Sequence, residues 1–393
     1  MIPWLLVTVV RPLLVDLFLW FVLVRPLQLR APLRLLLALL LLLDVLQPAI
    51  LQICGGSWLM PDLPGPLLAA LHLLRALACL FFIELVPLRF LSLATSAFLR
   101  VLSRRPPRPR NAPRPGRRAL VLLLLNLALL AAAFLTALLP PHLVVQPLAV
   151  PDLPPDLDGY RILHVSDIHA DPLAGAWRTR AIVRRANQAA PDLVCITGDF
   201  ADGTPARFAP ALAPLSDLCA PDGVYACTGN HEFYPPAHYP DWLPVYRSLG
   251  IRFLDGSPAA IARGSARILL SGMHDDHSGA TLSSRLDASG FAAAPPAPDE
   301  FRIFLKHRPV DLDPLAAAQV HLVLSGHTHA GQLPILDRLV TAFNQGHLSG
   351  LYRLPPATVL HVSPGASQWN GLPFRLFHPP QITLLVLHCD SAP

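Results

Sequence analysis

The sequence is poor in charge and contains almost no lysine. Charged residues make up 15% of its 393 residues, against about 25% in a typical soluble protein. Lys306 is the single lysine beside 30 arginines, a bias that reflects base composition rather than mechanism. Hydrophobic residues reach 53% and the mean hydropathy is +0.45. These values disfavour both a disordered chain and a wholly soluble one, because so much apolar surface requires lipid or a very large core.

Two further absences exclude other classes of protein. The six cysteines include no C-x-x-C pair, so neither a zinc ribbon nor a thioredoxin-like motif is indicated. The isoelectric point is near 9.1, yet residues 151–393 carry 17 bases and 22 acids. The excess of base lies in residues 1–150, with 14 arginines and four acids. Because the C-terminal part is net acidic, we expect no nucleic-acid-binding domain.

Long apolar segments occupy the first 140 residues. A membrane-spanning helix needs about 20 largely apolar residues. Asp44 and Arg75 lie within two of the segments, and we expect them to form a structural pair between helices, with a functional relay as the alternative. Residues 1–140 are therefore predicted to form a transmembrane region of about four helices, at 4–24, 32–53, 66–87 and 119–139.

The charges of the connecting loops predict the orientation of these helices. The loop at 100–118 contains eight arginines and no acid, whereas the loop at 54–65 contains Asp62 and no base. Basic loops remain in the cytoplasm. We therefore expect a multi-pass protein of the cell (inner) membrane whose C-terminal domain lies outside the cytoplasm. The first segment has no basic n-region and does not resemble a cleaved signal peptide.

The remainder of the chain has the pattern of an α/β domain. Residues 141–158 are rich in Pro and Asp, and we expect a linker there, followed by a domain at 159–393. In this domain short apolar strands alternate with helical segments. Polar residues follow the strands, at the carboxyl ends where ligand sites gather. They form five motifs: Asp167-x-His169, Gly198-Asp199, Gly229-Asn230-His231-Glu232, His307 and Gly326-His327-Thr328-His329.

These motifs predict a metal centre. Carboxylate, imidazole and amide oxygen together suit Mn, Fe or Zn. Seven such side chains exceed one tetrahedral site, and with one shared carboxylate they suffice for two divalent ions. A single histidine after a strand is more often an ordinary packed residue. Five motifs in order, each after an expected strand, argue against coincidence.

The five motifs resemble the DxH, GD, GNH[DE], H and GHxH pattern of the calcineurin-like metallophosphoesterase superfamily. The stretches HVSDIH, VCITGD and LSGHTHAGQ are most similar to its membrane-associated bacterial branch, the YkuE/YaeI-like phosphoesterases. The resemblance covers about residues 160–388 and implies a four-layer α/β/β/α sandwich. One departure is Ala330, which stands where that branch usually has a second glycine.

The resemblance also implies a role for each motif residue. Three residues would hold the first ion, three would hold the second, and one carboxylate would bridge the ions. In that order these are Asp167, His169 and His329; Asn230, His307 and His327; and Asp199.

Four other residues receive expected roles from the same resemblance. His231 matches a catalytic histidine that binds no metal. Asp202 is expected to orient His231, with Glu232 as the alternative. Arg375 would contact a substrate phosphate, with a surface ion pair as the alternative.

The expected activity is that of a membrane-anchored, dinuclear-metal-dependent phosphoesterase. It would hydrolyse a phosphodiester or a lipid-linked ester by attack of a metal-bridging hydroxide, and His231 would protonate the leaving oxygen. The expected partners are the lipid bilayer and a phospholipid or envelope component. A transporter or sensor with a regulatory hydrolase domain is the alternative, but it would need polar residues along the spans. The complete ligand set argues against an inactive binding module.

Overall fold

The computed structural model describes most of the chain, which forms two compact units. The units are Met1–Ala133 and Phe134–Pro393. The described residues are 10–25, 29–55, 63–103, 116–173, 175–234, 238–254, 258–275, 282–292, 294–334, 336–369 and 373–389.

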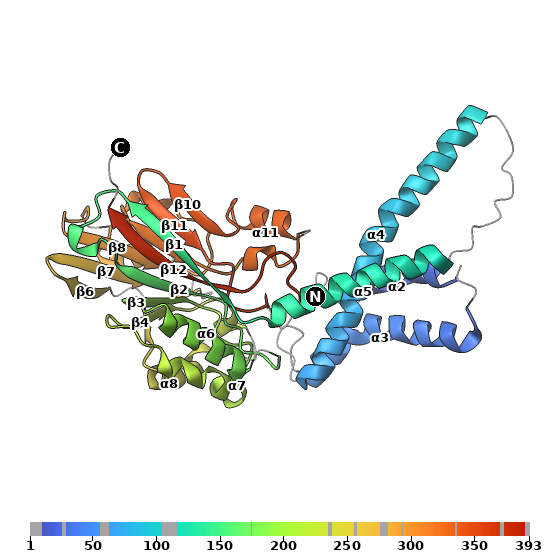
Figure 1. Ribbon diagram of the computed structural model, residues 1–393, viewed down its shortest axis with the longest axis horizontal. Helices are drawn as coiled ribbons and strands as arrows, with labels where there is room; N and C mark the ends of the chain where they lie inside the picture. Colours follow the sequence, from blue (N-terminus) through green and yellow to red (C-terminus); the bar gives the residue numbers. More distant parts are fainter. Residues whose placement is uncertain are drawn as a thin grey trace. The chain divides into compact units, whose positions relative to one another are not determined.

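The first unit is helical (Figure 1). Its elements are α2 (Arg11–Leu19), the π-helical turn η2 (Trp20–Val24), α3 (Ala31–Gly55), α4 (Gly65–Ser103) and α5 (Gly116–Leu138), whose last turn belongs to the second unit. Two segments of the described part are long and apolar enough to cross a membrane, Ala31–Leu51 and Gly65–Leu91, and Leu123–Leu138 is a shorter apolar helix. Residues 1–9, which include the start of the first span expected at 4–24, lie outside the described part.

α4 is longer than the expected segment 66–87. It continues through Pro87 to Ser103. A proline removes one backbone hydrogen bond but is tolerated in apolar helices whose neighbours satisfy the freed groups. The arginine-rich loop therefore begins later than expected, and its residues 104–115 lie outside the described part.

Polar side chains within the first unit pair with one another. Arg75 Nε donates to Asp44 Oδ1 at 2.7 Å, which joins α4 to α3. Asn126 Nδ2 donates to Glu84 Oε2 at 2.9 Å. The expected Asp44–Arg75 pair is confirmed, and such pairing lowers the cost of charge among apolar helices.

The second unit is built on two six-stranded mixed sheets (Figure 1). The first sheet has the order β1-β12-β2-β3-β4-β5, with β1 (His142–Val150), β12 (Gln381–Cys389), β2 (Arg161–Val165), β3 (Leu193–Thr197), β4 (Val224–Cys227) and β5 (Arg252–Phe253). The second has the order β10-β11-β9-β8-β7-β6, with β10 (Gly350–Leu354), β11 (Thr358–Val362), β9 (Leu322–Ser325), β8 (Glu300–Leu305), β7 (Ala266–Gly272) and β6 (Ala259–Arg263).

Apolar side chains hold four layers together. Ile162 of the first sheet and Ile303 of the second belong to the core between the sheets. Ile182 and Trp242 pack helices on the outer face of the first sheet, and Leu286 packs against the outer face of the second. The outer helices are α6 (Ala176–Gln188), α7 (Pro205–Leu212) and α8 (Tyr239–Ser248) on one side, and α9 (Leu282–Ser289) and α10 (Asp313–Ala317) on the other. The expected α/β/β/α sandwich is confirmed.

Five short elements complete the unit. They are the 3-10 turns η4 (Pro155–Leu157), η5 (Ala213–Asp217), η6 (His231–Phe233) and η7 (His329–Gly331), and the helix α11 (Asp337–Phe343). Two of them, η6 and η7, begin at motif histidines, directly at the strand ends where the polar residues gather.

The expectation of a linker at 141–158 is wrong for most of that segment. β1 pairs in parallel with β12 from His142 to Val150. Leu148 and Val150 are buried in the core between the sheets. The apolar and β-branched residues of this stretch favour a strand. Pro147 is tolerated because β1 is an edge strand, where no ladder donor is needed on the outer side. The sandwich therefore includes residues well before 159.

Candidate metal centre

The topology brings the five motifs together at one edge of the sandwich. β2, β3 and β4 are parallel neighbours in the first sheet, and β8 and β9 are parallel neighbours in the second. Their carboxyl ends therefore lie along common edges. The residues that follow these strands are at most 3% exposed, except for the half-buried His327: Asp167, His169, Asp199, Asn230, His231, His307 and His329.

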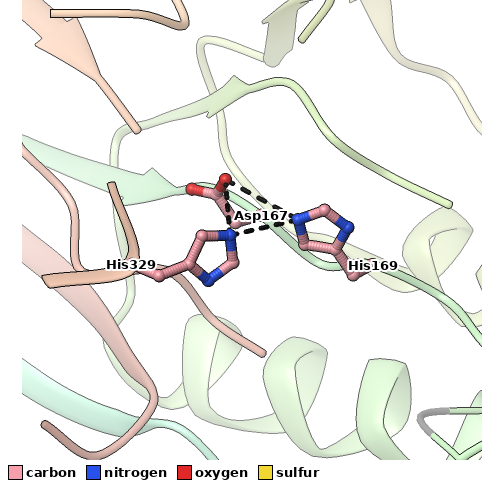
Figure 2. A group of neighbouring side chains, drawn as sticks. All are labelled: Asp167, His169 and His329. Carbon is pink, nitrogen blue, oxygen red and sulfur yellow. Dashed lines mark hydrogen bonds and ion pairs between the residues drawn. The ribbon is translucent and has the colours of Figure 1, made fainter. Parts of the chain in front are cut away.

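Asp167, His169 and His329 form the first cluster of candidate ligands. Figure 2 shows the three side chains pointing toward one another, Asp167 and His169 from the segment after β2 and His329 from the segment after β9. His329 Nε2 lies 3.2 Å from Asp167 Oδ1, and His169 Nε2 lies 3.9 Å from the same oxygen. The two Nε2 atoms are 3.1 Å apart. One carboxylate oxygen and two ring nitrogens thus surround one point, as three ligands of a single ion would.

Asp199, His307 and His327 form the second cluster. His307 Nε2 lies 3.1 Å from Asp199 Oδ2, and the rings of His307 and His327 are 5.1 Å apart between centroids. Asp199 Oδ2 is also 3.5 Å from Nε2 of His169 in the first cluster. Asp199 therefore lies between the two clusters.

The donor atoms of these residues fit divalent cations. His307 Nδ1 donates to the carbonyl oxygen of Thr197 at 2.6 Å, so Nε2 is the ring nitrogen that faces the cluster. Among the described residues, Asn230 Oδ1 is buried without a hydrogen-bond partner, and His307 Nε2 faces the carboxylate of Asp199. Buried polar atoms are rarely left unsatisfied, because each costs the full desolvation penalty. A cation at this position would satisfy both atoms.

The electrostatics of the clusters favour positive charge. Burial lowers the pKa of His169 and His307, but neighbouring carboxylates outweigh it and raise the two values to about 9 and about 10. Burial acts to raise the pKa of Asp167 and Asp199, yet the surrounding histidines hold both below the usual value. The carboxylates are therefore ionised. Metal ions can replace the protons that these carboxylates stabilise on the neighbouring histidines.

Asp202 is the carboxylate beside the ring of His231. Its Oδ1 lies 2.7 Å from His231 Nδ1 and 2.8 Å from His169 Nδ1. The alternative residue, Glu232, is used differently. Its carboxylate accepts the backbone N–H groups of Gly229, Phe200 and Asp199 at 2.6, 2.7 and 3.0 Å. Glu232 thus ties the loop after β4 to the loop after β3 and does not contact the His231 ring.

The backbone of the centre is strained. A left-handed residue other than glycine costs about 1–2 kcal/mol, and such residues cluster at functional sites. Gly198 has φ +87°, and a Cβ atom there would lie 2.1 Å from Gly229 N, so the motif glycine permits a close approach of two loops. Positive φ angles occur at five of the seven candidate ligands: Asp167, His169, Asp199, His327 and His329.

Arg375 occupies neither of its two expected positions, a contact with a substrate phosphate or a surface ion pair. The side chain is fully buried, which excludes a surface ion pair. Its guanidinium lies behind His329, with Nη2 at 3.1 Å from His329 Nδ1. The same group donates to the carbonyl oxygens of Pro364 and His378 at 2.6 and 2.9 Å. With these contacts made inside the fold, Arg375 supports a candidate ligand and is not placed to meet a substrate phosphate.

Two supporting groups were missed from the sequence. The Thr197 carbonyl that fixes His307 belongs to the backbone, which leaves no signal in residue identity. The contact of Arg375 with His329 joins residues 46 positions apart. A buried arginine needs several acceptors, but the sequence does not show which ones the fold provides.

Comparison with known proteins extends these observations. Residues 160–331 match the family of calcineurin-like phosphoesterases. The chain is 32% identical over 282 residues to "Transmembrane protein with metallophosphoesterase domain" of Danio rerio. This alignment covers 69% of this chain and 63% of that protein. It is 30% identical over 251 residues to uncharacterized metallophosphoesterase YkuE of Bacillus subtilis (strain 168), which covers 60% of this chain and 81% of that protein.

Two facts delimit these matches. A solved dimetal phosphatase from Danio rerio aligns with a TM-score of 0.34 at 13% identity, over 53% of this chain and 88% of that chain. The chain spans 63%, 58% and 47% of the first three curated relatives. The match to YkuE is more complete, and the motif residues, which all lie within 160–331, converge on one edge of the sandwich. The chain belongs to the calcineurin-like metallophosphoesterase family.

Proposed function

We propose that the chain is a membrane-anchored phosphoesterase that uses two divalent metal ions to hydrolyse phosphate esters. The observation that carries this proposal is the position of Asp199. Its Oδ2 atom lies within 3.5 Å of a histidine nitrogen in each ligand cluster. A carboxylate shared by two clusters is the arrangement that two-metal hydrolases require.

The clusters divide the proposed ligands between two ions. When bound, divalent ions such as Mn, Fe or Zn would activate a water molecule and offset the charge that develops on the phosphoryl oxygens. Asp199 would be shared between Asp167, His169 and His329 on one side and Asn230, His307 and His327 on the other.

The chain's own residues supply the proton and hold the ligands. Asp202 contacts the Nδ1 side of His231 and thereby fixes the orientation of the ring. The other ring nitrogen can then give a proton to the leaving oxygen, a step that contributes about 10²–10⁴ in rate. The carbonyl of Thr197 accepts the Nδ1–H of His307 from behind, as partners of ligand histidines do in metal sites. Arg375 packs behind His329, with its Nη2 atom beside Nδ1 of that ring.

The membrane helices favour a substrate in the envelope. Membrane association is supported by two apolar helices and by relatives named as transmembrane proteins. A phosphodiester in a phospholipid or another envelope component is therefore the proposed substrate class. The basic loops of the first unit favour placement of the sandwich outside the cytoplasm, in a multi-pass protein of the cell membrane.

Activity and metal content should be measured on the same purified full-length protein. We expect hydrolysis of an aryl phosphodiester or an aryl phosphomonoester that is abolished by a chelator and restored by Mn, Fe or Zn. His307→Ala should lose this activity because it removes a ligand. His388→Ala is the matched control, since this exposed histidine lies on β12 outside the clusters. A metal-loaded protein that is inert on both esters would contradict the proposal.

A further inference from the structure

Exposed apolar side chains gather beside the first ligand cluster. Single exposed apolar residues are ordinary on protein surfaces, whereas a group of them indicates a contact surface. The group comes from α6, from α11 and from two loops of the second unit. We call it the apolar rim: Trp177 (40% exposed), Leu339 (53%), Phe343 (76%), Trp369 (42%) and Phe377 (77%).

Three segments of the rim are fixed around Gly331, the last residue of η7, and Gln332, which follows it. Gln332 Oε1 accepts a hydrogen bond from the backbone N–H of Trp369 at 2.7 Å. The backbone carbonyl of Gln332 accepts one from the backbone N–H of Leu376 at 2.9 Å. Gly331 lies against the start of α11, since a Cβ atom there would be 2.6 Å from Asp337 Cα. α11 and both loops are thus anchored within three residues of the candidate ligand His329.

Trp177 is joined to the same region through Asp171. The Asp171 carboxylate accepts the Leu173 N–H at 2.6 Å and the Gln368 side-chain amide at 3.2 Å. Trp177 Nε1 in turn donates to the carbonyl of Leu173 at 3.2 Å. The beginning of α6 therefore lies next to the loop that carries Trp369.

The chain enters the second unit beside Trp177. Arg178, the next residue, is fully buried and donates to Ala137 O at 2.6 Å and to Leu139 O at 3.3 Å. Only three residues separate the end of α5 at Leu138 from the start of β1 at His142. At about 3.5 Å per residue, they allow a separation of roughly 14 Å. In the proposed anchored protein, this short connection would keep the second unit close to the bilayer surface.

The chemistry of the rim suits the interface between lipid and water. Leu339 and Phe343 are four residues apart and so share one face of α11, a helix in which no residue is buried. Tryptophan is enriched at membrane interfaces, because one part of its ring system is apolar and its N–H can remain hydrated. Short apolar helix faces that lie in the interface plane bind membranes in the same way.

We propose that the apolar rim rests in the interfacial layer of the lipid bilayer and holds the metal centre at the membrane surface. This docking adds a second membrane contact to the helical anchor. It requires the anchor but not the proposed hydrolysis. A lipid ester could then reach the centre from the bilayer without passing through water.

The test uses the full-length protein in phosphatidylcholine nanodiscs. An environment-sensitive fluorophore is attached to Phe343→Cys, and the matched control carries it on Ser248→Cys, at the exposed end of α8. The buried Cys195 and Cys227 stay in place. The remaining cysteines are changed to serine in both proteins: Cys54, Cys79, Cys219 and Cys389.

The docking proposal predicts different emission from the two labels. The label at 343 should show blue-shifted emission and lose most of its intensity when doxyl-labelled phosphatidylcholine is included, while the label at 248 should not respond. Adding Leu339→Glu to the 343-labelled protein should reduce both effects, because it places a charge on the same helix face. Equal, weak quenching of both labels would overturn the proposal. So would a 343 label that is shielded from water yet unquenched, since protein would then cover the rim.

The same samples separate this proposal from the proposed function. Hydrolysis of a soluble aryl phosphodiester should be unchanged by Leu339→Glu, because the rim contributes no metal ligand. Strong quenching at 343 in a protein that hydrolyses no ester would support docking and count against the enzyme. Full hydrolysis without quenching at 343 would support the proposed enzyme and count against docking.

Discussion

Asp202 is the residue through which the two proposed functions of the centre are linked. The single Oδ1 atom contacts His169, a candidate ligand, and His231, the candidate proton donor. Burial acts to raise the pKa of Asp202, but the two histidines outweigh it and lower the value to about 2. At neutral pH an ionised carboxylate therefore orients both rings at once.

Asp202→Asn should impair both functions. The amide keeps the shape but removes the charge, so we expect about 10- to 100-fold weaker binding of one ion. At saturating metal, kcat should still fall by about 10²–10⁴. Metal titration and steady-state kinetics of the full-length variant measure the two effects separately, with the exposed Asp158→Asn as the control. Wild-type kcat in Asp202→Asn would show that His231 does not depend on this carboxylate.

Ala330 occupies a position whose backbone favours glycine. Its φ is +51° and its side chain is 1% exposed, directly after His329. Ala330→Gly should relieve this strain and raise the free energy of unfolding by up to about 1 kcal/mol. Denaturant titration tests this, with Ala366→Gly as the control. Ala366 is equally buried and has no positive φ, so its replacement should destabilise. Similar losses in both variants would contradict the strain at Ala330.

At this scale the sequence predicts ligands better than their supports. The candidate ligands are side chains, so their identity and their order along the chain were visible in the sequence. The choice between Asp202 and Glu232 depended on which carboxylate turns toward His231. That direction is set by loop conformation, which residue identity alone does not determine.

The two sheets are joined across their strands by a pair of buried histidines. His164 on β2 and His361 on β11 approach to 2.7 Å between their Nδ1 atoms, and His164 Nε2 contacts Thr197 Oγ1 at 2.9 Å. Burial lowers the pKa of His361 to about 4 and holds that of His164 well below its usual value. Both rings are therefore neutral in the folded protein at pH 7.

This pair should make the sandwich sensitive to acid. The unfolded chain binds protons at these histidines below about pH 6.5, whereas the folded chain resists protonation until about pH 4. Their contribution to stability is thus complete above pH 6.5 and declines as the pH falls, by about 1.4 kcal/mol per pH unit for each histidine. Unfolding measured from pH 7 to 4 should have a smaller slope in His361→Gln. An unchanged slope would exclude His361 as a source of the acid sensitivity.

Elements with strong periodicity were predicted well, and those rich in proline were not. The strands that carry the motifs were visible as short apolar runs ending in polar residues. β1 was taken for a linker because prolines surround it, although Pro147 is compatible with an edge strand. α4 continues through Pro87 to Ser103, beyond the membrane span expected at 66–87.

For the molecule as a whole, the sequence predicts an apolar helical part followed by an α/β part. The charges of the loops predict how the helices are oriented in the membrane. Reporter fusions at residue 110 should lie in the cytoplasm, and fusions at residue 393 should lie outside it. Both positions fall outside the described residues, so this prediction rests on the arginines of the loop at 100–118. A cytoplasmic reporter at 393 would reverse the orientation and point to substrates on the cytoplasmic face.

The central claim is that two ions share Asp199 while His231 binds neither. Metal analysis of three full-length proteins tests it most directly. We predict two divalent ions per chain in the wild type and in His231→Ala, and loss of both ions in Asp199→Asn, because one carboxylate serves both clusters. A metal-free His231→Ala protein, or an Asp199→Asn protein that retains both ions, would contradict the account.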